Sequence, residues 1–318
     1  MDTVVKVAVI GNSRKHLETW SNIKNVEVIA IVSGKSHEWI PEAHQKKAVS
    51  NAEELKTMDV DVVDLCVPVN ERAEWIQQIA KEGVHIICET PLAETMEKAS
   101  SIIKECEAKK VHLFVGNRRR YSPEYADARN QVNNGNVGKL GVTRLSSGAP
   151  HPGGEEDIIT GLGMIEFDWL LWTFGDVERV MAKHVKKKRR DGWPVEYALI
   201  TLRHRDQSFT QVELNWAKTT KETSFEISGD TGMLTFNSNE SNPISLQLSG
   251  SEADVDLEEA VLFKSALERQ LEHVAAFVEV QNKPVKRADD ALKPIQLAEA
   301  ARKSAETGQP VSIEGVLK

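Results

Sequence analysis

The stretch VVKVAVIGNSRKH, residues 4–16, joins an apolar run to a glycine and then to a polar segment. A short apolar run that ends at a glycine is typical of a strand buried inside a sheet, and Gly11 predicts a tight turn where this strand ends. A helix is expected after the turn. This order of strand, turn and helix recurs as far as residue 117 and decides the fold class.

Further apolar runs predict strands at residues 26–34, 60–68, 84–91 and 111–117. Amphipathic segments at 72–83 and 95–110 lie between them and predict helices, with Gly83 ending the first and Thr95 capping the second. Alternating strands and helices imply parallel strands joined by right-handed crossovers, that is, an α/β doubly wound sheet. Ligands in such sheets bind beyond the carboxyl ends of the strands.

The remaining residues, from 123 to 318, have a different texture. Several runs alternate apolar with polar residues, as at Ala198, Ile200 and Leu202, and predict a large, open, mostly antiparallel sheet within an α+β domain. We therefore expect two domains, at residues 1–122 and 123–318. An open sheet face often supports association, so a homodimer or homotetramer through this sheet is expected.

The composition and charge of the chain argue against several classes of protein. The net charge of −8 argues against general nucleic-acid binding. No run approaches the length of a membrane span, and no secretory signal is seen at the start, so a cytoplasmic protein is expected. The three cysteines, Cys66, Cys88 and Cys106, lack metal-type spacing, and no metal is expected. A basic run at 183–192 is interpreted as a solvated hairpin arm.

The first turn, GNSRKH, resembles a dinucleotide-binding GxGxxG fingerprint imperfectly. Gly11 is present, but Ser13 and His16 stand where the other two glycines belong. Arg14 and Lys15 could compensate by meeting phosphate charge directly. The alternative is an ordinary turn with solvated basic residues.

The end of the second predicted strand bears on the choice of cofactor. An acidic residue there usually binds the ribose 2′-hydroxyl of NAD. This chain has Ser33, Gly34 and Lys35 instead, which suits the 2′-phosphate of NADP. A plain polar turn is the alternative.

The segment 155–176 predicts a largely buried helix in the second domain. Glu166 and Asp168 are the only carboxylates inside it, between residues 158 and 175, and we expect them to face a crevice between the domains. The alternative is a core helix with incidental acids.

Five motifs in order now resemble the glucose–fructose oxidoreductase, inositol dehydrogenase and MocA (Gfo/Idh/MocA) family of NAD(P)-dependent oxidoreductases. They are VAVIG, CETPLAET, VGNRRRYSPEY, GLGMIEFDWLLW and AARKSAETGQPV. The second is similar to the family's Cys-Glu-Lys-Pro-Leu-Ala pattern, and the fourth to its Asp-x-Gly-x-His-x-x-Asp helix.

The resemblance implies a Rossmann domain that holds NADP or NAD, and a substrate domain for a sugar, polyol or related carbonyl compound. By position it assigns cofactor contacts to Gly11, Asn12, Ser13, Arg14, Lys15, Ser33, Gly34, Lys35, Val67, Pro68, Glu89 and Thr90. Residues 11–15 would cradle the pyrophosphate, 33–35 would face the adenosine ribose, and Glu89 would lie near the nicotinamide ribose.

The chain departs from the family where the family handles protons. Thr90 replaces the catalytic lysine, Ile165 replaces the histidine and Gly161 replaces the acid before it, while Asp168 is retained. Neither isoleucine nor glycine can exchange a proton, and positioned acid–base groups commonly contribute about 10²–10⁴-fold to a rate. The family's usual mechanism is therefore not expected.

Two main hypotheses follow from these departures. In the first, the chain is an NAD(P)-dependent reductase with a rearranged site, whose candidate proton-handling groups are Thr90, Tyr121, His151, Glu166 and Asp168. In the second, it is a catalytically inactive dinucleotide- or ligand-binding homologue with a regulatory role. A structural subunit of a larger assembly is a third reading.

Overall fold

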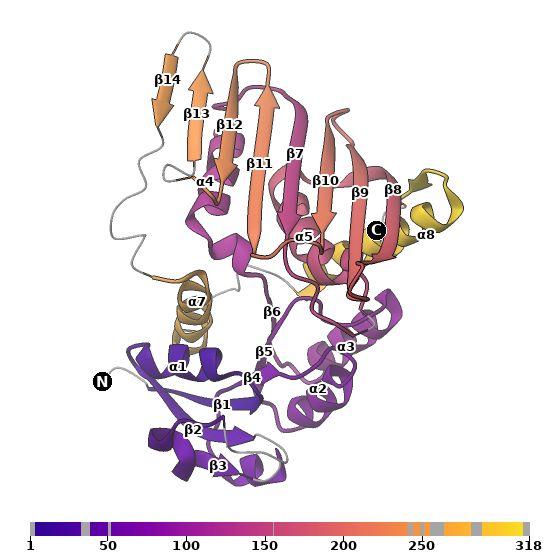
Figure 1. Cartoon of the computed structure of the whole chain (residues 1–318). Helices are drawn as coiled ribbons and strands as arrows, with labels where there is room; N and C mark the ends of the chain where they lie inside the picture. The colour runs from indigo at the N-terminus through magenta and orange to yellow at the C-terminus, as the bar shows by residue number, and fades with distance from the viewer. Residues whose placement is uncertain are drawn as a thin grey trace. The chain divides into compact units, whose positions relative to one another are not determined.

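The computed structural model describes residues 4–32, 39–49, 52–154, 156–240, 244–248, 251–254, 264–280 and 288–313. The chain forms two compact units (Figure 1). Unit 1 comprises residues 1–121 and 264–292, and unit 2 comprises residues 122–263 and 293–318. This division differs from the expected ranges 1–122 and 123–318 because a late segment of the chain belongs with the first unit.

Unit 1 contains a six-stranded parallel sheet with the order β3-β2-β1-β4-β5-β6. The strands are β1 (Val5–Gly11), β2 (Val26–Val32), β3 (Ala48–Val49), β4 (Val62–Cys66), β5 (His85–Glu89) and β6 (Leu113–Gly116). The five strands expected from the sequence form, and the order reverses between β1 and β4, so the predicted doubly wound α/β sheet is confirmed. The carboxyl ends of β1, β4, β5 and β6 therefore lie along one edge.

The crossovers of unit 1 carry helices α1 (Arg14–Asn22), α2 (Arg72–Lys81) and α3 (Met96–Ala108), with short 3-10 turns at Glu42–Lys47, Ala52–Thr57 and Arg118–Tyr121. The predicted cap of α3 is present, since the Thr95 hydroxyl accepts a hydrogen bond from the backbone N–H of Lys98 at 3.3 Å. Gly83, just past α2, adopts the left-handed conformation expected of a helix stop.

Helix α7 (Ala266–Val280) returns from far along the chain to complete the core of unit 1. Its apolar face carries Leu271 and Val274, which pack in the same buried cluster as Trp20 of α1 and Val7 of β1. The ring of Phe277 meets that of Phe114 edge to face, with centroids 5.0 Å apart. The sequence predicted this amphipathic helix but not its place in the first unit.

Unit 2 is built on a nine-stranded sheet with the order β14-β13-β12-β11-β7-β10-β9-β8-β15. The strands are β7 (Leu140–Gly148), β8 (Val177–Lys188), β9 (Pro194–His204), β10 (Phe209–Asn215), β11 (Glu222–Gly229), β12 (Gly232–Asn237), β13 (Ile244–Leu248), β14 (Ser251–Asp254) and β15 (Val311–Ser312). All neighbouring pairs are antiparallel except β7 with β10. The predicted open, mostly antiparallel sheet is thus confirmed.

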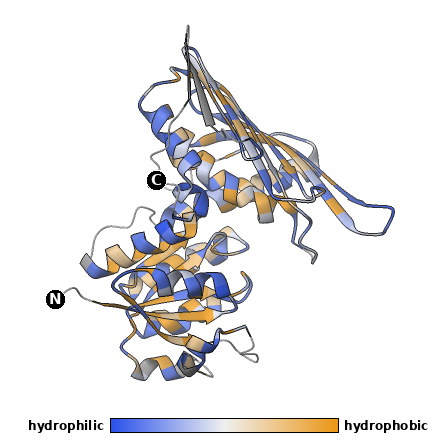
Figure 2. Cartoon of the chain, turned by 60° about the vertical axis from the view of Figure 1, so that its left-hand side comes forward, coloured by the Kyte–Doolittle hydropathy of each residue, from blue (hydrophilic) through white to orange (hydrophobic). Residues whose placement is uncertain are grey.

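Helices cover one face of this sheet (Figure 2). They are α4 (Pro123–Asn133), α5 (Met164–Phe174) and α8 (Leu292–Thr307), with a π-helical turn, η4 (Ile159–Gly163), leading into α5. Buried Phe167 and Trp169 of α5 form much of the core beneath the sheet. Large apolar side chains remain exposed on strands β8, β9 and β10, among them Met181, Leu199 and Phe209.

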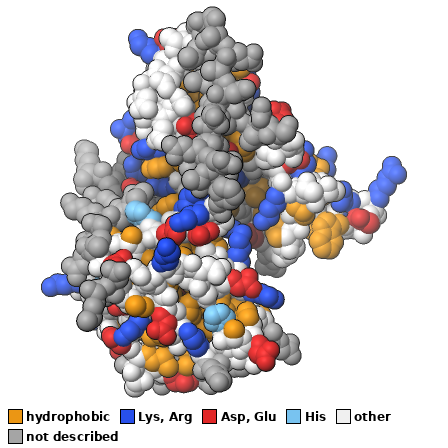
Figure 3. Space-filling view, turned by 90° about the vertical axis from the view of Figure 1, so that its left-hand side faces the viewer, with side chains coloured by type: hydrophobic (Ala, Val, Ile, Leu, Met, Phe, Trp, Pro, Cys, Tyr) orange, Lys and Arg blue, Asp and Glu red, His pale blue; other side chains and the backbone are white. Residues whose placement is uncertain are grey.

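Acidic and basic side chains are interspersed over the face shown in Figure 3. Within the described residues, no helix combines the length and the apolar character that crossing a bilayer requires.

Candidate functional site

The turn after β1 depends on a glycine. Gly11 has φ +102°, and a Cβ built on it would lie 2.2 Å from the carbonyl oxygen and 2.6 Å from the carbonyl carbon of Cys66 on β4. Because these are backbone atoms, no side chain could be accommodated by a small rearrangement. Gly11 therefore lets the ends of β1 and β4 approach closely at the edge where ligands of doubly wound sheets bind.

The N-terminus of α1 follows directly. Ser13 is its N-cap, and its hydroxyl accepts a hydrogen bond from the backbone N–H of His16 at 3.4 Å. Arg14 and Lys15 are exposed, and the Arg14 guanidinium forms an ion pair with Glu18 at 2.7 Å along the same helix. Exposed pairs of this kind are weak, so Arg14 can leave Glu18 for a bound phosphate. The structure thus brings together residues 11–15 as an exposed loop at a helix N-terminus, where anions are stabilised.

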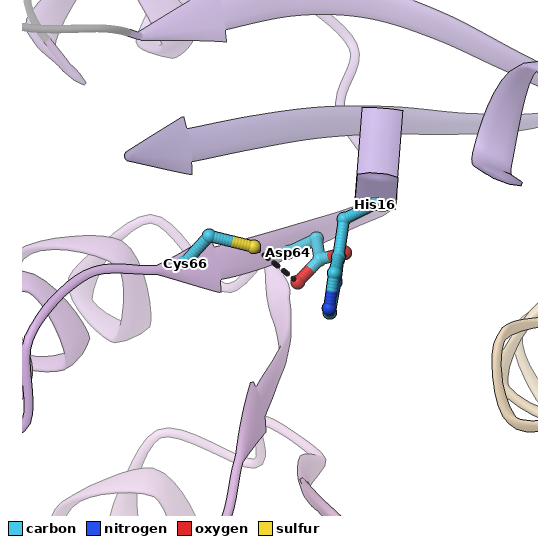
Figure 4. A group of neighbouring side chains, drawn as sticks. All are labelled: His16, Asp64 and Cys66. Carbon is cyan, nitrogen blue, oxygen red and sulfur yellow. Dashed lines mark hydrogen bonds and ion pairs between the residues drawn. The ribbon is translucent and has the colours of Figure 1, made fainter. Parts of the chain in front are cut away.

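A buried hydrogen-bond network lies beneath this loop (Figure 4). Asp64, in the middle of β4, is 1% exposed. One of its carboxylate oxygens accepts from the His16 ring at 2.8 Å and from the Trp20 indole N–H at 2.7 Å, and the other accepts from the Cys66 thiol at 3.4 Å. His16 occupies the position of the third fingerprint glycine, so a side chain that ties α1 to β4 replaces close helix–strand packing.

The titration of this network follows from its contacts. Burial by itself would lower the pKa of His16, but the charge and hydrogen bond of Asp64 outweigh burial and raise the pKa. Burial and the charge of Asp64 together hold the pKa of the Cys66 thiol well above its ordinary value. The imidazole therefore carries a proton toward Asp64, and the thiol remains protonated and donates.

The three side chains also offer metal-ligand chemistry. One ligand atom from each of His16, Asp64 and Cys66 lies within 4.8 Å of the others. Nitrogen, oxygen and sulfur together would suit a transition metal such as zinc. Each of the three groups already forms a hydrogen bond within the network. The cluster is therefore explained as a structural link between α1 and β4.

The ends of β4 and β5 are held by a buried arginine that the sequence analysis missed. Arg72, at the start of α2, donates from Nε to the carbonyl of Val67 at 3.2 Å and from Nη1 to the carbonyls of Glu89 and Pro91. The Thr90–Pro91 peptide bond is cis, and the Thr90 N–H donates to the carbonyl of Gly116 at 2.8 Å. Arg72 thus fixes the positions of Val67, Glu89 and Thr90 along one edge of the sheet.

The Glu89 carboxylate, at the end of β5, has protein partners of its own. Its Oε1 accepts a hydrogen bond from the Gln270 amide of α7, and its Oε2 lies 3.7 Å from Nε of Arg118. Tyr121 lies nearby in the same unit: its carbonyl accepts from Arg269, and its ring centroid is 6.1 Å from that of His273. The structure therefore places Glu89, Thr90 and Tyr121 in unit 1, on connected elements.

Three predicted cofactor residues, Ser33, Gly34 and Lys35, lie outside the described residues. Val67 is buried and Pro68 is exposed at the end of β4. Glu166 and Asp168 are 1% and 0% exposed within α5, inside the helical layer of unit 2.

Unit 2 contains a second group of polar side chains, centred on Glu196 of β9. The carboxylate is 7% exposed and lies 2.8 Å from Nε2 of His184, 3.3 Å from Nζ of Lys186 and 3.8 Å from Nε2 of His151. It also accepts a hydrogen bond from the backbone N–H of Ile158 at 3.1 Å. Burial would raise the pKa of Glu196, but the hydrogen bonds from His184, Ile158 and Lys186 outweigh it and lower the pKa.

An aromatic ring adjoins this group. The ring centroids of Trp216 and His151 are 5.0 Å apart. A Cβ built on Gly161 would lie 2.5 Å from Cζ2 of Trp216. The indole therefore fills the space next to the π-helical turn into which a side chain at residue 161 would project.

Comparison with known proteins identifies this architecture. Residues 5–117 match the model of an oxidoreductase family with an NAD-binding Rossmann fold, and residues 149–313 match its C-terminal alpha/beta domain. The chain belongs to the Gfo/Idh/MocA oxidoreductase family.

Individual relatives of the family are distant in sequence. The chain is 23% identical to the uncharacterized oxidoreductase YrbE of Bacillus subtilis, over 99% of this chain and 98% of the relative. It is 27% identical to myo-inositol 2-dehydrogenase of Thermotoga maritima, over 59% of this chain and 58% of that enzyme. Among solved structures, the WlbA dehydrogenase of Bordetella pertussis, in complex with NADH and UDP-GlcNAcA, superposes with a TM-score of 0.86 at 17% identity, covering 99% of both chains.

The structure shows what surrounds Gly161 and Ile165, the two residues that depart from the helix pattern of the Gfo/Idh/MocA family. At the position of the family's acid, the Trp216 ring occupies the space that an acidic side chain at Gly161 would need. At the position of the family's histidine, Ile165 is half-buried at the start of α5. Neither Gly161 nor Ile165 has a side chain that can exchange a proton. His184, Lys186 and Glu196 were not identified from the sequence, because they belong to no local motif.

Proposed function

We propose that this chain is an NAD(P)-dependent reductase that acts on a carbonyl group of a sugar or polyol-like compound, with NADP as the preferred cofactor. The observation that carries the proposal is the Gly11 turn, which opens onto the α1 N-terminus at the edge shared by β1 and β4. Relatives named as myo-inositol 2-dehydrogenase and D-apiose dehydrogenase support the substrate class.

The residues of unit 1 fit a dinucleotide. The backbone N–H groups of Asn12 and Ser13 and the exposed Arg14 and Lys15 would hold the pyrophosphate. Val67 and Pro68 would flank the adenine-side ribose, Glu89 and Thr90 would lie near the nicotinamide ribose, and residues 33–35 would meet the 2′-phosphate. A bound nicotinamide would supply or accept a hydride.

Equilibrium titration with NADPH and NADH, followed by nucleotide fluorescence, tests the cofactor. We expect both to bind, NADPH more tightly, and expect Gly11→Ala to abolish binding. Turnover is then assayed with NADPH and D-glyceraldehyde, D-xylose and 2-keto-myo-inositol. Failure of both nucleotides to bind the folded chain would contradict the proposal.

A catalytically inactive binding protein is the second candidate, favoured by Thr90 and Ile165 at the positions of the family's lysine and histidine. It predicts dinucleotide binding without turnover of any tested carbonyl. In that case the double variant Thr90→Lys with Ile165→His gains activity if the substrate pocket is intact, and a chain already active without these changes excludes this candidate.

We further propose that the open face of the nine-stranded sheet mediates a homodimer or homotetramer. Met181, Leu199 and Phe209 are 42%, 54% and 38% exposed on adjacent strands of that face, which is a large apolar exposure for a lone chain. Sedimentation analysis of Leu199→Lys tests this by its expected shift toward monomer. Cys66, Cys88 and Cys106 form no disulfide bond within the described residues, which supports our further proposal of a reducing, cytoplasmic setting.

A further inference from the structure

We propose that Gln270, on helix α7, is a positioning residue for the dinucleotide: it holds the Glu89 carboxylate as the hydrogen-bond acceptor for the nicotinamide-side ribose. The inference rests on the proposed function and deepens it, because it names a residue on which cofactor affinity depends. All the residues that carry it belong to unit 1.

The order of the strands decides which half of a dinucleotide can reach Glu89. The order is β3-β2-β1-β4-β5-β6, and the Gly11 turn follows β1, where the order reverses. A dinucleotide bound at such a point extends along the edge in both directions, with its adenosine half over the end of β2. Its nicotinamide half therefore extends over β4 and β5, and Glu89 is the last residue of β5.

The Glu89 carboxylate is suited to bind a ribose. Its side chain is 23% exposed, and an ionised carboxylate accepts hydrogen bonds of the kind that the neighbouring hydroxyls of a ribose donate. After burial and Asp64, the negative charge of Glu89 also acts on the pKa of the His16 ring and of the Cys66 thiol and raises each. The carboxylate therefore lies within electrostatic reach of the first turn of α1.

Gln270 reaches Glu89 from 181 residues further along the chain. It is 1% exposed, and its side-chain amide donates from Nε2 to Oε1 of Glu89. The chemistry fixes this orientation of the amide, because the flipped amide would set its carbonyl oxygen against a carboxylate oxygen, and neither could donate. With Oε1 held in this way, Oε2 of Glu89 remains for Arg118, which lies 3.7 Å away, and for a ligand.

A glycine makes room for the pair. Gly116 on β6 is the register partner of Glu89 on β5. A Cβ built on Gly116 would lie 2.4 Å from Nε2 of Gln270 and 2.9 Å from Oε1 of Glu89, the two atoms that form the hydrogen bond. Both atoms are at the ends of flexible side chains, so a methyl group at residue 116 would displace the hydrogen bond rather than the backbone.

Packing alone does not explain a glutamine at this position. Oε1 of Gln270 is buried and has no hydrogen-bond partner among the described residues. It belongs to the lining of a small cavity, together with Ile87, Tyr121, His273 and Val274. An unsatisfied buried carbonyl oxygen destabilises a fold, and a leucine of similar size would avoid it. The donor of the amide, rather than its volume, is what the contact with Glu89 uses.

The test measures nucleotide affinity by calorimetry, so it does not depend on turnover. Gln270→Leu and Gly116→Ala are compared with the intact chain and with two controls. Gln78→Leu changes an exposed glutamine of α2, and Gly141→Ala adds a Cβ to β7 that would meet only the carbonyl oxygen of Ser228, at 3.7 Å. With NADP⁺ we expect Gln270→Leu and Gly116→Ala to bind about tenfold more weakly and both controls to bind as the intact chain does.

An adenosine fragment locates the effect within the nucleotide. Adenosine 2′,5′-bisphosphate lacks the nicotinamide ribose, so all the variants are expected to bind it as the intact chain does. If the intact chain prefers NAD⁺, the same comparison uses NAD⁺ and ADP. Urea unfolding serves as the check on folding, and we expect the midpoint of Gln270→Leu to be unchanged, because the substitution removes an unsatisfied oxygen together with the hydrogen bond.

A conservative variant supplies a second readout. Gln270→Glu keeps the shape of the side chain but sets a second carboxylate against Glu89, and two carboxylates that share a site raise the pKa of one of them. Below that pKa the shared proton again donates to Glu89. We therefore expect the affinity of Gln270→Glu for NADP⁺, relative to that of the intact chain, to be low at about pH 8 and to recover at about pH 5.5. The other charged and titratable groups around the pair are the same in both chains: His16, Cys66, Arg118, Arg269 and His273.

The outcomes separate the inference from the function on which it rests. If Gln270→Leu and Gly116→Ala bind the whole nucleotide as tightly as the intact chain, the inference is overturned while the proposed function stands. If they lose affinity for the whole nucleotide and for the adenosine fragment equally, Gln270 supports the fold in general and the inference is overturned as well. If the intact chain binds no nucleotide, the proposed function fails, and the inference fails with it.

Discussion

The sheet edge of unit 1 and the Glu196 group of unit 2 are built in opposite ways. At the first, the decisive features are backbone features: the Gly11 turn, the N-terminus of α1, and strand ends fixed by the carbonyl contacts of Arg72. At the second, the side chains of His151, His184 and Lys186 and the backbone N–H of Ile158 converge on the Glu196 carboxylate. The fold itself supplies the first site, whereas the second exists only because of particular side chains.

This difference bears on how the chain's residues compare with the family pattern at the two places. A dinucleotide is held largely by backbone groups, so Ser13 and His16 can replace glycines while the loop keeps its course. Proton transfer needs specific side chains, and neither Gly161 nor Ile165 has a side chain that can exchange a proton. The following predictions test whether the contrast between backbone and side-chain sites is real.

The largest effect is expected from a substitution at Gly11, in the backbone site. Gly11→Ala is expected to destabilise unit 1 by about 3 kcal/mol or more, since the new Cβ meets backbone atoms of Cys66 and the φ of +102° is strained for alanine. Gly83→Ala is the matched control: its φ is +75° but no atom lies within 4 Å, so about 1 kcal/mol is expected. Urea unfolding measures both, and equal losses would mean that close approach at Gly11 is unimportant.

Asp64 is a test of the contrast, because its side chain stabilises the helix that follows the Gly11 turn. Asp64→Ala leaves His16 and the Trp20 indole buried without an acceptor and is expected to cost about 3 kcal/mol of unfolding free energy. Asp59, whose exposed carboxylate pairs with Lys6, is the control, and Asp59→Ala is expected to leave stability unchanged. A neutral result for Asp64→Ala would show that the buried network does not brace α1 against β4.

Arg72 tests whether strand ends need an external support. Arg72→Met removes donors to the carbonyls of Val67, Glu89 and Pro91, and is expected to cost about 2 kcal/mol and to weaken NADPH binding about tenfold. Arg14→Met, a change at an exposed pair, is expected to weaken binding without loss of stability. Thermal unfolding and nucleotide titration on both variants decide between the two effects.

The smallest expected effect is a dependence of stability on pH. Because the pKa of His16 is raised in the folded chain above its ordinary value of 6.5, its contribution is complete below that value and is lost as the pH rises through the folded pKa. A difference of one between the pKa of His16 in the folded chain and in the unfolded chain corresponds to about 1.4 kcal/mol of unfolding free energy. His16→Gln is expected to remove this part of the decline between neutral and alkaline pH, and an unchanged curve would argue against a protonated imidazole.

Much of unit 1 could be predicted from the sequence because its signals are local. Apolar runs, the glycine at residue 11 and the Thr95 cap each act within a few residues, and the structure has them where they were expected. The pairing of His16 with Asp64, 48 residues away, could not be foreseen: residue 16 was recognised only as a missing glycine. Arg72 was missed for the same reason, since its acceptors are backbone carbonyls, which leave no mark on the sequence.

Unit 2 resisted prediction more strongly. Its alternating strands gave the sheet, but the pairing that sets Lys186 opposite Glu196 depends on the register of a long hairpin within a basic run. From the sequence, that run was interpreted as a solvated arm. The return of residues 264–292 to unit 1 was likewise invisible, because an amphipathic helix does not state which sheet it covers.

The late arrival of α7 has a consequence for how the protein is made. A ribosome finishes all of the parallel sheet and all of unit 2 through residue 263 before it releases the helix whose Leu271 and Phe277 close the first core. Until then the nascent chain carries an uncovered apolar surface over α1 and β1, of the kind that recruits chaperones. Because synthesis proceeds from the amino terminus, the parallel sheet cannot complete its core until α7 has been made. A chain that ends before residue 264 should therefore accumulate as an aggregating or chaperone-bound species rather than as a free-standing nucleotide-binding module.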